Sequence, residues 1–198
     1  MNHEISSDGG VPLGVVRDHG FAGAFVSKWI IDTETLTVLH GEDLIKEAFQ
    51  WDVVTESYQP LTTAILRLCS ADLPALTAFY NPATGLGYNG RIFMDGEEVG
   101  AEGRGFAHLL DGRSYELPWL GKFSYENSVA NPGTGDLTVV VGLDDTSPRG
   151  QVYVYIGEKT DSSDPIAAAG LKNGNLYGIK VTGFPLEDFA TGIPSGTP

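Results

Sequence analysis

The sequence has little of three things: cysteine, basic charge and long apolar runs. Its one cysteine, Cys69, excludes an internal disulfide, so cysteine usage says nothing firm about the compartment. Lysine and arginine number 12 against 26 aspartate and glutamate residues, a formal net charge of −14. Nucleic acid is therefore not expected as a partner, because a phosphate backbone needs a basic face. An anionic membrane surface is disfavoured for the same reason, and no apolar run predicts a membrane span.

What the chain does have is a composition suited to one folded domain with many turns. It has 198 residues, of which 41% are hydrophobic, enough for a real core. Glycine is abundant at 26 residues and proline reaches 11, which is typical of short strands joined by tight turns. The acidic charge has two open explanations: it serves solubility alone, or it includes carboxylates gathered for cations.

Strand signals dominate between the two ends of the chain. Runs rich in β-branched and aromatic residues alternate with turn signals, which favours antiparallel sheets in a propeller, a sandwich or a barrel. The predicted strands cover residues 24–31, 36–40, 62–68, 91–94, 105–110, 114–117, 137–141, 151–156 and 176–181, with a hairpin turn at 32–35. Acidic residues in a first turn predict a helix over 42–49, and a shorter one is possible over 73–79.

Both ends of the chain predict a fragment of a longer protein. The polar turn at residues 6–10 follows the start at once, as if a strand were entered in its middle, and residues 192–198 form a proline- and glycine-rich loop. We expect one domain over 1–183 and a loop or tail over 184–198. The alternative is a short natural N-terminus with a flexible tail.

Several carboxylates follow or interrupt predicted strands. Glu126 lies in a Phe-Ser-Tyr-Glu-Asn segment, and the strand after the polar turn 131–135 ends in Asp144 and Asp145. Carboxylates gathered at strand ends commonly hold hard cations. An acid placed among Phe123 and other apolar residues of a part-buried strand also needs a partner. We therefore predict that Glu126 is a metal ligand.

Four landmarks of the PhoX-type alkaline phosphatases, one of them a pair of segments, have similar counterparts in the right order along the chain. Residues 2–4 (Asn-His-Glu) match the N-H-E motif of that family, and residues 120–127 (LGKFSYEN) resemble its L-G-R-F-x-H-E-A segment. Residues 68–70 (Leu-Cys-Ser), followed by 96–98 (Gly-Glu-Glu), resemble its N-C-S-G and C-E-E pair. The pair 144–145 stands where the family has Glu-Asp. The chain is thus similar to a divergent member of this family from residue 2 to about 181.

The resemblance implies part of a β-propeller, about three to four four-stranded blades that do not close into a ring. It also implies iron and calcium at the mouth of the channel, hydrolysis of phosphate monoesters, and a periplasmic or extracellular location. The partners would be a phosphorylated small molecule and the remainder of the propeller itself. Glu98 and Glu126 would be the catalytic residues. The full set of implied metal ligands is Glu4, Cys69, Glu97, Glu98, Glu126, Asp144 and Asp145.

The chain also departs from the family. Tyr125 replaces the histidine before the key glutamate, the spacing from Cys69 to Glu98 is wider, and the family's later carboxylate ligands have no match. With too few ligands for a bridged metal cluster, we expect little or no phosphatase turnover from this chain alone. A calcium-binding propeller without catalysis, or a structural piece that cannot fold alone, remains an open alternative.

The single residues keep their structural alternatives as well. Cys69 stands in an apolar run, where a lone cysteine is often an inert buried residue. Glu97, Glu98 and Glu102 could form a solvated acidic loop, and Asp144 and Asp145 could be turn formers. His3 and Glu4 could be strand-end polar groups. Arg104 could meet a phosphate or form a surface salt bridge.

Overall fold

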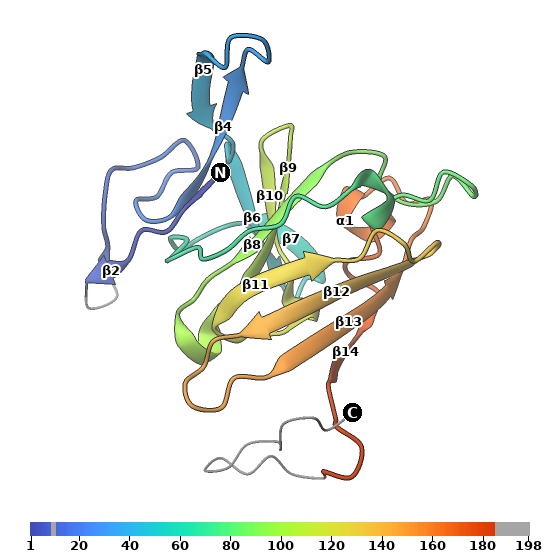
Figure 1. Cartoon of the computed structure of the whole chain (residues 1–198). Coiled ribbons are helices and arrows are strands. Elements are labelled where there is room, and N and C mark those ends of the chain that lie inside the picture. The colour runs from blue at the N-terminus through green and yellow to red at the C-terminus, as the bar shows by residue number, and fades with distance from the viewer. Residues whose placement is uncertain (9–10, 185–198) are drawn as a thin grey trace.

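The computed structural model describes residues 1–8 and 11–184, and within them strands far outnumber helices (Figure 1). The predicted all-β class is confirmed at this level. The predicted tail lies outside the described residues from residue 185 on. In the described part, no helix is long and apolar enough to cross a membrane, in line with the absence of a long apolar run.

A four-stranded antiparallel sheet forms from the C-terminal part of the chain, with its strands in chain order (Figure 1). Its strands are β11 (Tyr125–Ala130), β12 (Leu137–Asp144), β13 (Val152–Glu158) and β14 (Asn175–Gly178). In β12 the buried positions Thr138 and Val140 alternate with more exposed ones, because successive side chains of a strand point to opposite faces. The sequence therefore predicted three strands of this sheet, whereas β11 was not among the predicted strands.

A five-stranded sheet lies behind it and connects distant parts of the chain. In spatial order its strands are β7 (Ser57–Pro60), β6 (Glu47–Asp52), β10 (Arg113–Glu116), β9 (Gly105–Leu109) and β8 (Ile92–Gly96). All neighbours are antiparallel except β6 and β10, which run parallel. That parallel pair needs a long connection, so β6 and β10 are far apart in the sequence.

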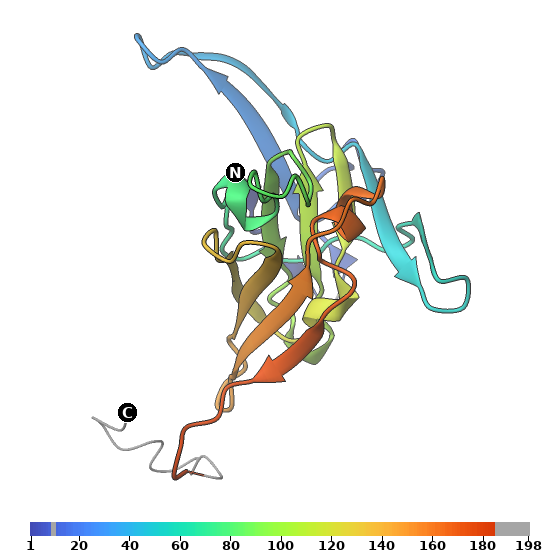
Figure 2. The same ribbon diagram turned by 90° about the vertical axis from the view of Figure 1, so that its right-hand side faces the viewer.

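The N-terminal part adds a smaller sheet and a hairpin that projects from the body (Figure 2). Its strands are β1 (Asn2–His3), β4 (Phe25–Ile31) and β5 (Val38–Asp43), and the short pair β2 (Ser7–Asp8) and β3 (Val11–Pro12) lies apart. The predicted hairpin turn is confirmed. Asp32 Oδ1 accepts hydrogen bonds from the backbone N–H groups of Glu34 and Thr35, at 3.0 and 2.7 Å, as aspartate does at turns.

The helix predicted over residues 42–49 is wrong. Strand β5 runs to Asp43 and β6 begins at Glu47. Between them the backbone N–H of Lys46 donates to the carbonyl of Gly112 at 2.8 Å, which joins this segment to the start of β10. Local helix signals are weak and tertiary pairing overrides them. The short helix considered over 73–79 is a single 3-10 turn.

Helical structure is confined to short turns in the described residues. They are η1 (Leu76–Ala78), η2 (Gly100–Glu102), η3 (Pro118–Leu120) and α1 (Pro165–Ala168). Helix α1 was not predicted, although the sequence Asp164-Pro165 is a typical helix start. In the structure Asp164 caps the helix by accepting from the N–H of Ile166.

The strand predicted over residues 62–68 is also wrong. The backbone N–H and carbonyl groups of this segment form hydrogen bonds, but not with a neighbouring strand of a sheet. The carbonyl of Ile65 accepts from the N–H of Ala24 at 2.9 Å, and the N–H of Leu66 donates to Glu97 Oε1 at 2.7 Å. Only Leu68 forms an isolated bridge, to Glu97. Buried backbone groups need partners, but side chains can supply them.

Two separate hydrophobic clusters hold these sheets together. The larger lies between the five-stranded and four-stranded sheets and includes Met94, Leu109, Leu117, Val140, Tyr155 and Ile166. The smaller lies where the N-terminal strands meet the other face of the five-stranded sheet and includes Val26, Ile45, Ile65, Leu68 and Phe106. The described sheets keep open edges and none closes on itself.

Gly96 at the end of β8 allows the close contact between β8 and β11. A Cβ at this position would lie 2.3 Å from Cγ of Tyr125. Tyr125 is fully buried, stacks on Phe123 with ring centroids 3.8 Å apart, and donates its hydroxyl to the carbonyl of Gly121 at 2.9 Å. The Tyr125 ring is therefore held in place and cannot move away from a Cβ at position 96.

We expect Gly96→Ala to lower the free energy of unfolding by about 1–3 kcal/mol, the usual cost of overpacking a well-packed site. Urea denaturation would measure it. Gly178→Ala is the matched control, because a Cβ on Gly178 in β14 would meet nothing within 4 Å. Equal unfolding midpoints for the two variants would contradict the proposed role of Gly96.

Candidate metal centre

One group of possible metal ligands converges within the described residues. It consists of Cys69, Glu98 and Glu126, whose ligand atoms all lie within 4.8 Å of one another. The thiol of Cys69 donates to Glu126 Oε2 at 3.4 Å. The predicted convergence of one cysteine and two glutamates is therefore confirmed.

Cys69 and Glu98 are brought together because residues 67–69 run antiparallel beside the end of β8. The N–H of Cys69 donates to the carbonyl of Gly96 at 3.2 Å, and the N–H of Glu98 donates to the carbonyl of Arg67 at 3.0 Å. These backbone hydrogen bonds fix the two segments against each other. The two side chains then project from adjacent stretches of rigid backbone.

Glu126 reaches the same place through a β-bulge. Tyr125 pairs with Asp144 and Asn127 with Leu143, so Glu126 is the extra residue of β11 against β12. Bulges re-aim side chains and are over-represented beside active sites. The carbonyl of Glu126 also accepts from the N–H of Ser70 at 3.2 Å, which anchors the bulge beside the cysteine.

Tyr125 has a different role from Glu126, although they are neighbours. Its side chain is fully buried against Gly96 and Gly105, whereas Glu126 is exposed. The expectation that Glu126 is part-buried and needs a partner for that reason is wrong. Its exposure instead places a carboxylate on the solvent side of the centre, while Cys69 and Glu98 are half-buried.

Arg67 lies beside the centre and connects it to Glu4, another predicted ligand. Arg67 Nη1 donates to Glu98 Oε1 at 2.7 Å and its Nε donates to Glu4 Oε1 at 2.9 Å. Glu4 therefore lies next to the centre through Arg67 and is not one of the converging ligands. Arg67 was not predicted as a site residue, although a cation two residues before the cysteine is conspicuous in so acidic a chain.

The conformation of Arg67 is unusual as well. Its φ is 30°, a region that a non-glycine residue rarely adopts. Backbone strain of this kind gathers at functional sites. Nearby, the amide of Asn2 donates to the carbonyl of Leu68 at 3.4 Å and also to that of Cys69. The Asn-His-Glu segment thus supports the cysteine loop.

Glu97 does not belong to this group. Its side chain is only 2% exposed and accepts from Arg104 Nε and Nη2, each at 2.7 Å. It also accepts from the N–H of Leu66, so its oxygens are engaged in a structural network. Arg104, for which a surface salt bridge was considered, forms a largely buried one instead.

Three other candidates lie outside the group and have structural partners. Asp144 Oδ1 accepts from the N–H of Thr146 at 3.0 Å, in the role of a turn former, and the N–H of Asp145 donates to the carbonyl of Ser124. His3 Nε2 lies 2.8 Å from the hydroxyl of Ser27, and its ring stacks on Phe25.

Comparison of the chain with protein families, with curated proteins and with solved structures finds no match. The resemblance to the PhoX-type phosphatases therefore stays a prediction carried by the sequence landmarks. Three of those landmarks, around Asn2, Cys69 and Glu126, together with Glu98, meet at one place.

Metal binding through Cys69 would depend on pH, because the thiol must first lose its proton. Burial, and then hydrogen bonds with Glu98 and Glu126, raise the pKa of Cys69 to about 12. The thiol is thus protonated at neutral pH, whereas a metal binds the thiolate. Binding must release one proton, so affinity should rise about tenfold per pH unit below that pKa. Titrations with zinc(II), which does not oxidise, at several pH values would measure the slope. A slope of zero would exclude thiolate ligation.

Proposed function

We propose that the chain binds a transition-metal ion, iron in particular, through Cys69, Glu98 and Glu126, and that this centre serves the hydrolysis of phosphate monoesters. The observation that carries the proposal is the meeting of one thiol and two carboxylates from three separate segments within 4.8 Å. Three acidic groups this close repel one another once ionised, and a cation removes that repulsion.

The donor set fits iron better than calcium. A thiolate is a soft ligand suited to transition metals, and carboxylates suit iron as well. Calcium takes about 6–8 oxygen ligands, and the group offers only two carboxylates. Of the neighbouring acids Asp144 and Asp145, the first already accepts a hydrogen bond from the N–H of Thr146, and neither belongs to the converging group. Calcium is therefore the less supported part of the proposal.

Three protein ligands leave coordination positions open, as catalytic metal sites do. A bound metal would supply Lewis acidity and a more acidic water. The chain's own contribution is position and charge. Arg67 holds Glu98 in place through a 2.7 Å hydrogen bond and adds a positive charge beside the centre. Exposed Glu126 faces the solvent from which a substrate would come.

A propeller architecture belongs to this proposal too. The four-stranded meander β11–β14 has the form of a propeller blade, which supports it. The five-stranded sheet, with its parallel pair β6 and β10, does not have that form. The periplasmic or extracellular location and a phosphorylated small-molecule substrate rest on the resemblance alone.

The test is an assay of the chain on p-nitrophenyl phosphate with added iron and calcium. We expect little turnover at most, because a bridged cluster needs more ligands than this chain offers. Any turnover should be abolished by a chelator and removed by Glu126→Gln. Glu102→Gln is the control, since Glu102 is exposed and pairs only with Lys122 at 3.2 Å. Turnover that survives Glu126→Gln would contradict the catalytic part. Metal binding with no turnover would favour the non-catalytic scaffold.

A further inference from the structure

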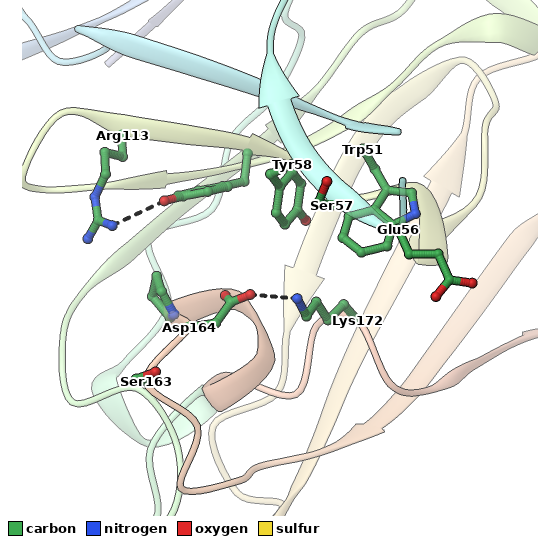
Figure 3. Close-up of a pocket in the computed structure, with 10 residues that line it drawn as sticks. Trp51, Glu56, Ser57, Tyr58, Arg113, Ser163, Asp164 and Lys172 are labelled. Atoms are coloured by element: carbon green, nitrogen blue, oxygen red, sulfur yellow. Dashed lines mark hydrogen bonds and ion pairs between the residues drawn. The ribbon is translucent and has the colours of Figure 1, made fainter. Parts of the chain in front are cut away.

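A pocket with a chemistry of its own lies apart from the metal centre. It measures about 420 Å³ and lies between strands β6, β7 and β10 on one side and the turn before α1 on the other (Figure 3). None of its lining residues belongs to the metal centre.

One wall of the pocket is aromatic. Trp51 and Tyr58 pack edge to face with ring centroids 5.2 Å apart, and Tyr58 packs in the same way on Tyr115 at 4.9 Å. Trp51 also contacts Trp119 at 4.8 Å. Trp119 lines a smaller hollow of about 200 Å³ that shares Trp51 with the pocket. The aromatic surface therefore extends beyond one pocket and could follow an elongated ligand.

The opposite wall is polar and carries both signs of charge. Lys172 Nζ lies 2.5 Å from Asp164 Oδ2, and the ammonium lies 5.2 Å from the ring of Trp51 (Figure 3). Asp164 is itself held in place, because it caps α1 through the N–H of Ile166 at 2.9 Å. The ammonium also lies 5.7 Å from the ring of Tyr58, so the polar groups border the aromatic rings and are held beside them.

The charges of the lining indicate a ligand without net charge. An anion would meet the carboxylates of Glu56 and Asp164, and a cation would meet Arg113 and Lys172. Donors and acceptors lie side by side, as a molecule with many hydroxyl groups needs. Aromatic faces in turn accept the apolar C–H face of such a molecule.

We propose that this pocket binds a neutral oligosaccharide of hexose units. One sugar ring lies against Trp51 and its neighbours, with its hydroxyls bonded to Lys172 and Asp164. The smaller hollow beside Trp119 takes the next unit. Small-molecule sites commonly combine such an aromatic lining with a few placed polar groups.

Titration with cellohexaose, maltohexaose and mannohexaose, followed by tryptophan fluorescence and calorimetry, tests this. We expect at least one to bind with a Kd of about 1 mM or tighter, and Trp51→Ala to weaken it at least about tenfold. The matched control is Trp29→Ala, because Trp29 is 47% exposed on the projecting hairpin and should leave binding unchanged.

A second variant keeps the aromatic wall intact. Lys172→Met removes the ammonium but keeps much of the side chain, and should weaken binding while the urea midpoint shows that the fold persists. Failure of all three hexasaccharides to bind would overturn the proposal, as would unchanged binding by folded Trp51→Ala. Binding of tetramethylammonium or inorganic phosphate in a Trp51-dependent way, without sugar binding, would also overturn it.

Discussion

Cys69→Ser is expected to weaken iron(II) binding by at least about a hundredfold, because it removes the soft ligand of the centre. A serine hydroxyl does not ionise near neutral pH, so two carboxylates would remain, one of them already bonded to Arg67. The substitution is nearly isosteric at a half-buried position, so stability should change little. Anaerobic titration against a competing chelator would measure the affinity.

The control for this loss is Glu102→Gln, which removes an acid of the same region without touching the centre. Glu126→Gln should fall between the two, because it removes one oxygen ligand and leaves the thiol. If Cys69→Ser binds iron(II) as tightly as the unchanged chain, the thiol is not a ligand. Cys69 would then be an ordinary part-buried cysteine.

Glu97→Gln is expected to lower the free energy of unfolding by about 3–5 kcal/mol, the usual result of removing one partner of a buried ion pair. Glu97 is 2% exposed and Arg104 13%, and they share two hydrogen bonds of 2.7 Å. The amide would leave the guanidinium charge without its partner, and its NH₂ group would face donors. Urea denaturation would measure the loss.

The neighbouring residue supplies the sharpest control. Glu98→Gln touches a salt bridge in which Arg67 is 39% and Glu98 9% exposed. Because Arg67 reaches solvent and keeps a second carboxylate partner, Glu4, its charge is not left buried and unpaired, so this variant should lose less stability than Glu97→Gln. It should instead weaken metal binding. Glu97→Gln should lower the free energy of unfolding, but its folded molecules should bind the metal as tightly as the unchanged chain. Similar losses of stability in both variants would contradict this division of roles.

The candidate site was predicted in part. The landmarks singled out Cys69, Glu98 and Glu126, and these three converge. They favoured Glu98 over Glu97 as the catalytic carboxylate, but kept Glu97 as a metal ligand too, since both match the same motif. Successive side chains near a strand end point to opposite sides. Glu97 faces the side with Arg104, and Glu98 faces the side with Cys69. Only the packing of residues 64–69 decides which glutamate faces which side.

The fold, too, was predicted in part. Alternation of apolar and polar residues by itself determined the all-β class, most of the strands in the second half of the chain and the hairpin turn at Asp32, because these depend on local backbone preferences. The acidic composition likewise set the expected partners. Residues 42–49 and 62–68 were misjudged because their hydrogen bonds go to distant residues, Gly112 and Glu97 among them.

Three features of the candidate metal centre and of the pocket were decided only by the tertiary structure. The bulge at Glu126 depends on the register of β11 against β12, which no local pattern reports. Arg67 joins Glu4 and Glu98 across distant parts of the chain. The aromatic pocket joins Trp51 of β6, Tyr115 of β10 and Lys172 of the loop after α1. Each arises from contacts between residues far apart in sequence, whose pairing is set by packing of the whole chain and not by any segment alone.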